Sequence, residues 1–273
     1  MLKNITLGQF FPGTTIVHRL DPRTKFVLTF VYVVALFLCG NFYGFGFLLI
    51  MLCLCITASK IKLKLILRGL KPLIIVIAIT GFINIFFTQG ETVLFKFWRL
   101  TVTTEGLYNA ATMLVRIVML ITGTFMLTYT TSPIHLTDAM ENLLNPLKKI
   151  KVPVHELSMM MSIALRFIPT LIEETDKIMS AQKARGADFE SGNLMQKAKA
   201  LLPLLIPLFV SAFRRADELA IAMESRCYSG GVGRTKLKQL KYSGADIAAF
   251  ALGFAVLAVT IALRFLPDWL KAI

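Results

Sequence analysis

The sequence predicts an all-α fold: a polytopic membrane protein with about five spanning helices and a separate region of long amphipathic helices. Two observations support this prediction. Hydrophobic residues make up 56% of the 273 positions and charged residues only 17%, which is far from the usage of soluble domains. Several uncharged runs are also long enough to cross a hydrocarbon core of roughly 30 Å, which takes about 20 helical residues.

Five apolar runs are candidates for the spanning helices. They cover residues 26–38, 42–58, 73–87, 107–129 and 245–265. The first two are separated by so few residues that only a tight turn fits between them, and the third is short for a membrane span. A further apolar run, 198–213, contains Pro203 and Pro207. The sequence leaves open whether this run is a broken or slanted membrane helix or lies in the cytosol.

The placement of the basic residues orients these runs. A net charge of +14 has the sign needed for nucleic acid binding, but many of the bases gather between the apolar runs. Residues 60–71, after the second run, contain five bases and no acid. Cytoplasmic loops of membrane proteins carry such an excess of lysine and arginine. We therefore expect a multi-pass protein with a cytoplasmic amino terminus, an external carboxyl terminus and no nucleic acid partner.

Successive spans cross the membrane in opposite directions, and this alternation divides the chain into three parts. Residues 1–129 are predicted to form a membrane domain with four spans, and residues 244–273 contain the last spanning helix. Between them lies the range 130–243, with 16 bases and 11 acids, which the alternation places in the cytoplasm.

The sequence shows no motif for bond-making chemistry. The three histidines form no H-E-x-x-H motif, and the four cysteines are too scattered for a zinc site. We find neither a G-x-x-x-x-G-K-[ST] phosphate-binding loop nor a G-x-S-x-G nucleophile motif. We expect no catalytic residue, no cofactor and no metal in this chain, which argues against a membrane enzyme.

Two stretches of the cytoplasmic range resemble each other. When residues 168–186 are aligned with residues 209–227, two charged pairs coincide. These pairs are Asp176 with Asp217 and Arg185 with Arg226. The triplets around the arginines are Ala184, Arg185, Gly186 and Ser225, Arg226, Cys227. We interpret the match as a structural repeat.

Apolar residues recur at helical spacing in both stretches, which predicts amphipathic helices at about 169–186 and 209–227. Glycines predict where the two helices stop: at Gly186 for the first helix and within 229–231 for the second helix. A single arginine at a helix end is explained by the helix dipole, worth about 0.3–1 kcal/mol.

Two arginines in matched settings indicate two similar partner sites, because a guanidinium offers a planar fork of donors to a carboxylate. Asp176 and Asp217 are candidates for a supporting role, although solvated charges on a helix face explain them as well.

Arg116 lies within the fourth apolar run, where a charge is costly and marks a functional candidate by default. A carboxylate such as Glu105, near the external end, or the interior of the protein would accommodate it. The sequence leaves both arrangements open.

Residues 8–13 (GQFFPG) and 18–25 (HRLDPRTK), together with the triplet at 184–186, resemble motifs of the transmembrane T components of energy-coupling factor (ECF) transporters. These are vitamin and metal importers of prokaryotes, and the resemblance extends over essentially the whole chain. The triplet at 184–186 matches the first of two arginine signatures of that family. The triplet at 225–227 matches the looser second signature only at its arginine.

The resemblance implies specific partners. In that family two long coupling helices cross, and each arginine docks into a groove of one ATP-binding subunit. It implies that two similar or identical ATP-binding subunits, which hold the ATP and Mg, meet Arg185 and Arg226. The T component connects them to a substrate-binding membrane subunit, the S component, in the lipid bilayer of a prokaryotic cell. The transported vitamin or metal is then a property of the S component.

The alternative is a standard ABC permease subunit, which forms the substrate pathway itself. Such a subunit ordinarily offers one major coupling site to one ATPase, whereas this chain offers two candidate sites. The two interpretations therefore differ in the expected composition of the purified complex.

Overall fold

The computed structural model describes residues 10–88, 92–97, 100–189, 193–230 and 239–265. These residues divide into two compact units. The spanning unit contains the described residues up to Ser132 and those from Leu240 onward, and the long-helix unit contains those between Pro133 and Gln239. Whether the predicted ranges 1–129, 130–243 and 244–273 act as functional domains stays a prediction.

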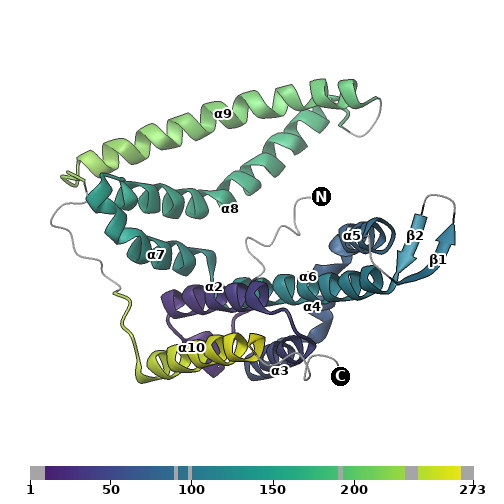
Figure 1. Ribbon diagram of the computed structural model, residues 1–273. Coiled ribbons are helices and arrows are strands. Elements are labelled where there is room, and N and C mark those ends of the chain that lie inside the picture. Colours follow the sequence, from purple (N-terminus) through teal and green to yellow (C-terminus); the bar gives the residue numbers. More distant parts are fainter. Residues whose placement is uncertain (1–9, 89–91, 98–99, 190–192, 231–238, 266–273) are drawn as a thin grey trace. The chain divides into compact units, whose positions relative to one another are not determined.

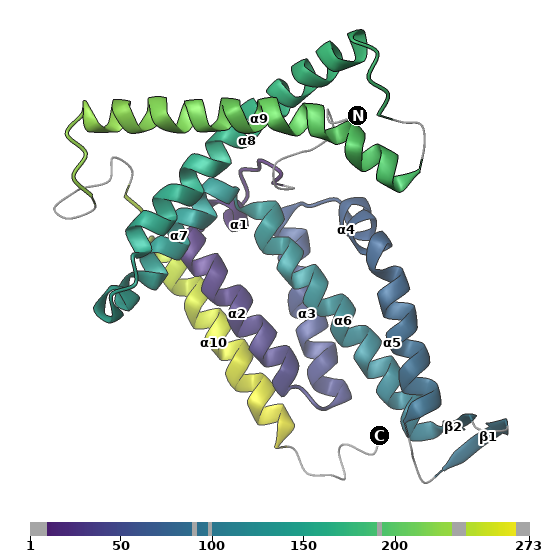
Figure 2. The same ribbon diagram turned by 90° about the horizontal axis from the view of Figure 1, so that it is seen from above.

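Five helices of the spanning unit lie side by side (Figure 2). They are α2 (Pro22–Leu38), α3 (Phe42–Ser59), α5 (Ile74–Phe87), α6 (Thr104–Thr130) and α10 (Gly244–Arg264). The α5 helix packs on α6, α10 packs on α2 and α3, and α2 also packs on α6. The described helical segments include four that are long and apolar enough to cross a membrane, and α2 adds a helix of 17 residues. The prediction of about five spanning helices is confirmed.

The third apolar run is longer in the structure than in the sequence prediction. The α4 helix (Leu63–Leu70) leads through a 3₁₀ turn (Lys71–Leu73) directly into α5. Together they form a helical segment of 25 residues, which is long enough to span. The cluster of bases therefore lies partly within helical structure, and Pro72 falls in the 3₁₀ turn, where its missing N–H is tolerated.

Two smaller elements complete the spanning unit. The α1 helix (Ile16–Arg19) precedes α2, and a two-stranded antiparallel hairpin separates α5 from α6. Its strands are β1 (Val93–Phe97) and β2 (Leu100–Thr103), which pair with Phe97 opposite Leu100 (Figure 1). The sequence pattern did not predict this hairpin.

The core of the spanning unit lies where α2, α3 and α6 meet. Its buried apolar side chains include Leu36, Leu48 and Met119, one from each of these helices. Close approach of α2 and α6 needs a glycine, because a side chain at Gly123 would collide with the ring of Tyr32. Many large apolar side chains elsewhere on the spanning unit are exposed, as expected for a surface that faces lipid.

A buried carboxylate ties the first long helix of the spanning unit to the last. One oxygen of Asp246, which lies in the first turn of α10 and is 1% exposed, accepts from the backbone N–H of Asp21 at 2.8 Å. Its other oxygen accepts from the backbone N–H and the hydroxyl of Ser243, both at 2.8 Å. Asp21 in turn binds the guanidinium of Arg23 at 3.1 Å, and that guanidinium lies 4.2 Å from the ring centre of Tyr242.

Lys25 links further segments at the same end of the spanning unit. Its ammonium is buried and donates to the backbone carbonyls of His18 at 3.0 Å and Thr130 at 2.9 Å. Thr130 is the last residue of α6, so a cation meets the negative end of that helix dipole. The Asp21 to Lys25 stretch, singled out in the sequence, therefore joins α2, α6 and α10.

The long-helix unit consists of α7 (Pro133–Leu144), a 3₁₀ turn (Asn145–Ile150), α8 (Val154–Ala184) and α9 (Leu194–Glu224). A carboxylate holds α7 to α8, because Glu141 accepts from Ser158 at 2.7 Å and pairs with His155 at 3.0 Å. The α8 and α9 helices pack against each other and cross, as Figure 2 shows.

The predicted helices at about 169–186 and 209–227 begin too late. Both α8 and α9 have 31 residues, roughly 46 Å at 1.5 Å per residue. Pro169 lies inside α8, and Pro203 and Pro207 lie inside α9, so these prolines are accommodated within each helix rather than starting it. The apolar run at 198–213 belongs to α9, which is not among the four membrane-length helices of the described chain.

We predict that Asp246→Ala lowers the melting temperature of the full chain in detergent by about 4–8 °C, because it leaves the buried N–H of Asp21 without an acceptor and removes the bonds from Ser243. Thermal unfolding measures this change. Glu173→Ala, at an exposed acid of α8, is the control and should leave the melting temperature unchanged. Equal melting temperatures for the two variants would show that the Asp246 contacts do not hold the helices together.

Candidate functional site

The end of α8 places Arg185 on a tightly defined turn. Gly186 follows with a φ of +89°, in the left-handed region that favours glycine. The backbone N–H of Ala187 then reaches the carbonyl of Gln182 at 2.9 Å, and that of Gly186 reaches Lys183 at 3.0 Å. This pair of bonds is the Schellman motif, which satisfies the last carbonyls of a helix.

The end of α9 has the same backbone structure around Arg226. Cys227 has a φ of +56°, so it takes the left-handed place of the glycine. The N–H of Tyr228 reaches the carbonyl of Met223 at 3.1 Å, and that of Cys227 reaches Glu224 at 2.8 Å. The helix stop predicted within 229–231 is therefore wrong by a few residues, because a non-glycine residue adopts the left-handed conformation here. The two triplets differ in sequence and agree in structure.

Both arginines are available to a partner. Their side chains are exposed, and neither guanidinium forms an ion pair or hydrogen bond with the residues that the structure describes. The neighbours Ala184 and Ser225 are small and exposed too, which lets another backbone approach. Figure 2 shows the carboxyl ends of α8 and α9 on different sides of their crossing, so the structure does not bring the two arginines together.

A polar contact fixes where the helices cross. The carboxylate of Glu174 on α8 accepts from the hydroxyl of Ser211 and, at 2.9 Å, from the guanidinium of Arg215 on α9. These bonds, first of all the one from Ser211, lower the pKa of Glu174, so the contact keeps an ionised carboxylate at neutral pH.

This contact joins equivalent positions of the repeat. Glu174 and Arg215 are 41 residues apart, the same offset that separates Arg185 from Arg226. Each contact residue therefore precedes its arginine by the same number of positions, which corresponds to roughly 16 Å of helix. The two helices extend equally far from their contact to their arginine ends.

The two aspartates of the repeat differ in their surroundings. Asp176 is half-buried and its backbone carbonyl accepts from Ser180 at 2.8 Å, whereas Asp217 is exposed. A supporting role for either carboxylate stays a prediction. Within the described ranges no group of three or more His, Cys, Asp or Glu side chains is placed to hold a metal ion. The expected absence of cofactors also stays a prediction.

The structure shows that part of the apolar run 198–213 forms an exposed face on α9, which the sequence did not predict. It consists of Leu202, Leu205, Ile206, Phe209, Val210 and Phe213, which are 45–66% exposed. Their three- and four-residue spacing was a visible signal, but the same spacing also fits a helix that buries this side. Soluble surfaces rarely expose so large a patch, so this face marks an interaction surface.

Arg116 of α6 faces the interior of the spanning unit. Its Nη2 donates to the backbone carbonyl of Cys39 at 3.0 Å, just beyond the end of α2, and its guanidinium lies 5.3 Å from the ring centre of Phe45. Glu105 instead accepts from the hydroxyl of Thr92 at 2.9 Å. Glu105 lies about three helical turns before Arg116. Of the two arrangements that the sequence left open, the structure therefore shows the one in the interior and not the pairing with Glu105.

Comparisons with known proteins agree with the membrane architecture. A family model described as "Cobalt transport protein" (CbiQ) matches residues 13–237. The energy-coupling factor transporter transmembrane protein EcfT of Thermosediminibacter oceani is 53% identical over 266 residues, which cover 97% of this chain and 100% of that protein. Proteins of the same name from Clostridium kluyveri (54% over 265 residues, 97% and 98%) and Bacillus subtilis (46% over 264 residues, 97% and 100%) are also similar.

The left-handed Cys227 leads to a prediction about the end of α9. A side chain with a Cβ is strained at this φ by about 1–2 kcal/mol, so Cys227→Gly should strengthen the end of the helix and Cys227→Val should weaken it. Hydrogen exchange of the amides of Cys227 and Tyr228 measures this, with an expected slowing in the glycine variant of about five-fold. Cys227→Ala controls for loss of the thiol. Faster exchange in the glycine variant than in the alanine variant would contradict the left-handed turn.

Proposed function

Because this chain belongs to the family of energy-coupling factor transporter transmembrane proteins, we propose that Arg185 and Arg226 each bind one ATP-binding subunit of such a transporter. The chain is the transmembrane T component of the transporter, and this function is favoured over that of a standard ABC permease subunit. The T component couples ATP hydrolysis to uptake, and ATP and Mg belong to the partner subunits.

The observation that supports two partner sites most strongly is the identity of the two helix ends. Both arginines directly precede a left-handed residue, and the same two backbone bonds close both turns. Two different roles would not require the same backbone at both ends. Two similar or identical ATP-binding subunits would require the same backbone at both ends, because each subunit presents the same groove to its arginine.

The chemistry of the site suits a carboxylate partner. Each guanidinium is held near the carboxyl end of a helix, where the dipole favours a cation, and can offer two parallel N–H donors. Burial of this pair against a partner would remove water from both charges. Truncation of one member of such an interfacial pair costs about 2–5 kcal/mol, because the remaining charge is left unpaired.

The Glu174 contact gives the two ends a mechanical connection. Two helices that are held together at equivalent positions move as a pair. A displacement of the arginine end of one helix is therefore transmitted to the arginine end of the other. A change in the separation of the two ATP-binding subunits would thus alter the crossing of α8 and α9. In this proposal the crossing is the coupling element of the transporter.

The exposed apolar face of α9 suits the third partner. An S component is a membrane protein, and its apolar surface would cover the side chains from Leu202 to Phe213 that the chain leaves exposed. In this proposal the long-helix unit and the amino terminus lie on the cytoplasmic side of a prokaryotic cell membrane and the carboxyl terminus lies outside. The identity of the imported vitamin or metal then depends on the S component.

We predict that Arg185→Ala and Arg226→Ala each weaken attachment of one ATP-binding subunit by about 30-fold or more and reduce coupled uptake, with the double variant most severely affected. Copurification of the subunits with the tagged chain and uptake into proteoliposomes measure the two effects. Arg214→Ala is the matched control, because Arg214 is an exposed arginine of α9 away from its end. Normal assembly and uptake in the double variant would refute the assignment.

The composition of the wild-type complex separates the two functions. A T component should recover two ATP-binding subunits and one small membrane S protein with a single copy of this chain. Two copies of this chain, each with one ATPase and no separate S protein, would instead identify a standard ABC permease.

A further inference from the structure

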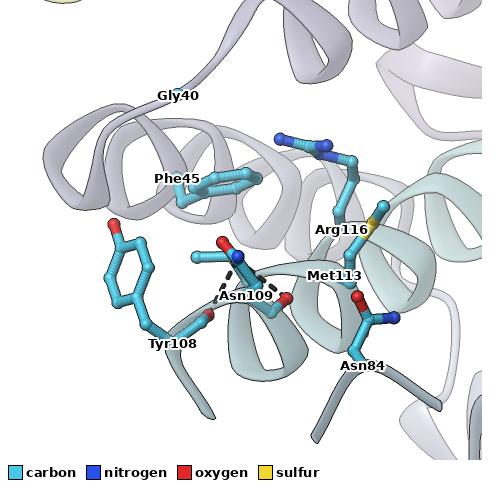
Figure 3. Close-up of a pocket in the computed structure, with 8 residues that line it drawn as sticks. Gly40, Phe45, Asn84, Tyr108, Asn109, Met113 and Arg116 are labelled. Carbon is cyan, nitrogen blue, oxygen red and sulfur yellow. Dashed lines mark hydrogen bonds between the residues drawn. The ribbon is translucent and has the colours of Figure 1, made fainter. Parts of the chain in front are cut away.

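A cavity of about 290 Å³ lies between α3, α5 and α6 (Figure 3). Eight residues line it: Gly40, Phe45, Asn84, Tyr108, Asn109, Thr112, Met113 and Arg116. The cavity is close in size to small-molecule pockets of proteins, which begin at roughly 300 Å³. It is far from both arginine ends in the sequence and is not explained by their role.

Arg116 gives the cavity a positive charge that the described residues do not neutralise. One N–H group of its guanidinium caps α2 through the carbonyl of Cys39, but its Nε is buried and has no hydrogen-bond partner among the described residues. A guanidinium carries five N–H donors and no acceptor. None of the eight described lining residues is acidic. In Figure 3 the guanidinium lies beside Phe45, near the Gly40 turn.

The other polar side chains of the cavity add donors around this cation. The carboxamide of Asn109 and the hydroxyl of Tyr108 form no hydrogen bond with a described residue through their side chains. Asn84 uses one N–H to bind the carbonyl of Thr80 at 2.9 Å, and its second N–H has no hydrogen bond to the residues that the structure describes. Donors from α5 and α6 therefore line the same half-open cavity as the guanidinium.

We propose that this cavity binds an oxyanion, specifically a phosphate group. A tetrahedral phosphate presents several acceptor oxygens, which match a guanidinium and neighbouring amide and hydroxyl donors. An unneutralised arginine inside a membrane-spanning unit is costly, and a bound anion removes that cost. The group is either the headgroup of a phospholipid or free inorganic phosphate. Phe45 and the partly exposed Met113 supply apolar walls that suit the glycerol end of a lipid.

The test uses the assembled transporter in detergent, after removal of bound lipid, with native mass spectrometry to count bound molecules. Three probes are added: phosphatidylglycerol, a diacylglycerol with the same acyl chains and no phosphate, and inorganic phosphate. We expect one phosphate-bearing molecule per chain, and an affinity at least about 10-fold lower in Arg116→Gln. Arg19→Gln is the control, because it removes an exposed arginine of α1 that is not among the residues lining the cavity.

A second variant keeps the test valid if Arg116→Gln loosens the α2 cap. Asn109→Leu removes a donor from an exposed position and leaves the Arg116 to Cys39 bond in place, and it should weaken binding about three- to ten-fold. Competition by inorganic phosphate identifies the free anion as a ligand, and its failure to compete identifies the lipid headgroup. Binding that is equal in wild type and Asn109→Leu would overturn the proposal, as would phosphatidylglycerol that binds no better than diacylglycerol together with inorganic phosphate that does not bind.

Discussion

The contact of Glu174 with Ser211 and Arg215 determines the geometry on which the proposed coupling depends. It joins residues that are equivalent in the repeat, and so it sets equal lengths for the two helix arms that end at Arg185 and Arg226. If one helix slipped by one turn at this crossing, its own arm would change by about 5.4 Å and the other arm would stay the same. Two similar ATP-binding subunits could then no longer meet the two arginines in the same way.

The repeat itself could be predicted from the sequence, because it appears as a spacing: two charged pairs at one constant offset. The structural identity of the helix ends could not. Glycine and cysteine differ strongly in their preference for a left-handed backbone, so Cys227 gave no signal that it adopts the conformation of Gly186. The starts of α8 and α9 were also missed, because Pro169, Pro203 and Pro207 are read locally as helix boundaries. In the folded chain these prolines lie inside continuous helices.

The spanning unit was easier to predict because the membrane restricts the secondary structures that a spanning segment can adopt. A backbone in lipid must satisfy its own hydrogen bonds, so each long uncharged run was expected to be a helix. Partners of polar side chains were harder to predict, since they lie far apart in the sequence. Asp246 meets Asp21 across 225 positions, and Arg116 meets the carbonyl of Cys39 rather than the carboxylate of Glu105. A helix end can thus accept one hydrogen bond from a buried cation without neutralising it, and only the fold shows which partner is used.

Site-specific photo-crosslinking tests the central claim, that this chain holds two ATP-binding subunits through separate helix ends, most directly. A photoreactive residue is introduced at Ala184 or Ser225, next to each arginine, in the assembled transporter. The account predicts that each position forms an adduct with an ATP-binding subunit, and that a chain labelled at both positions carries two such adducts at once. Adducts with a single ATP-binding subunit for which the two positions compete, or adducts with a membrane subunit alone, would contradict it.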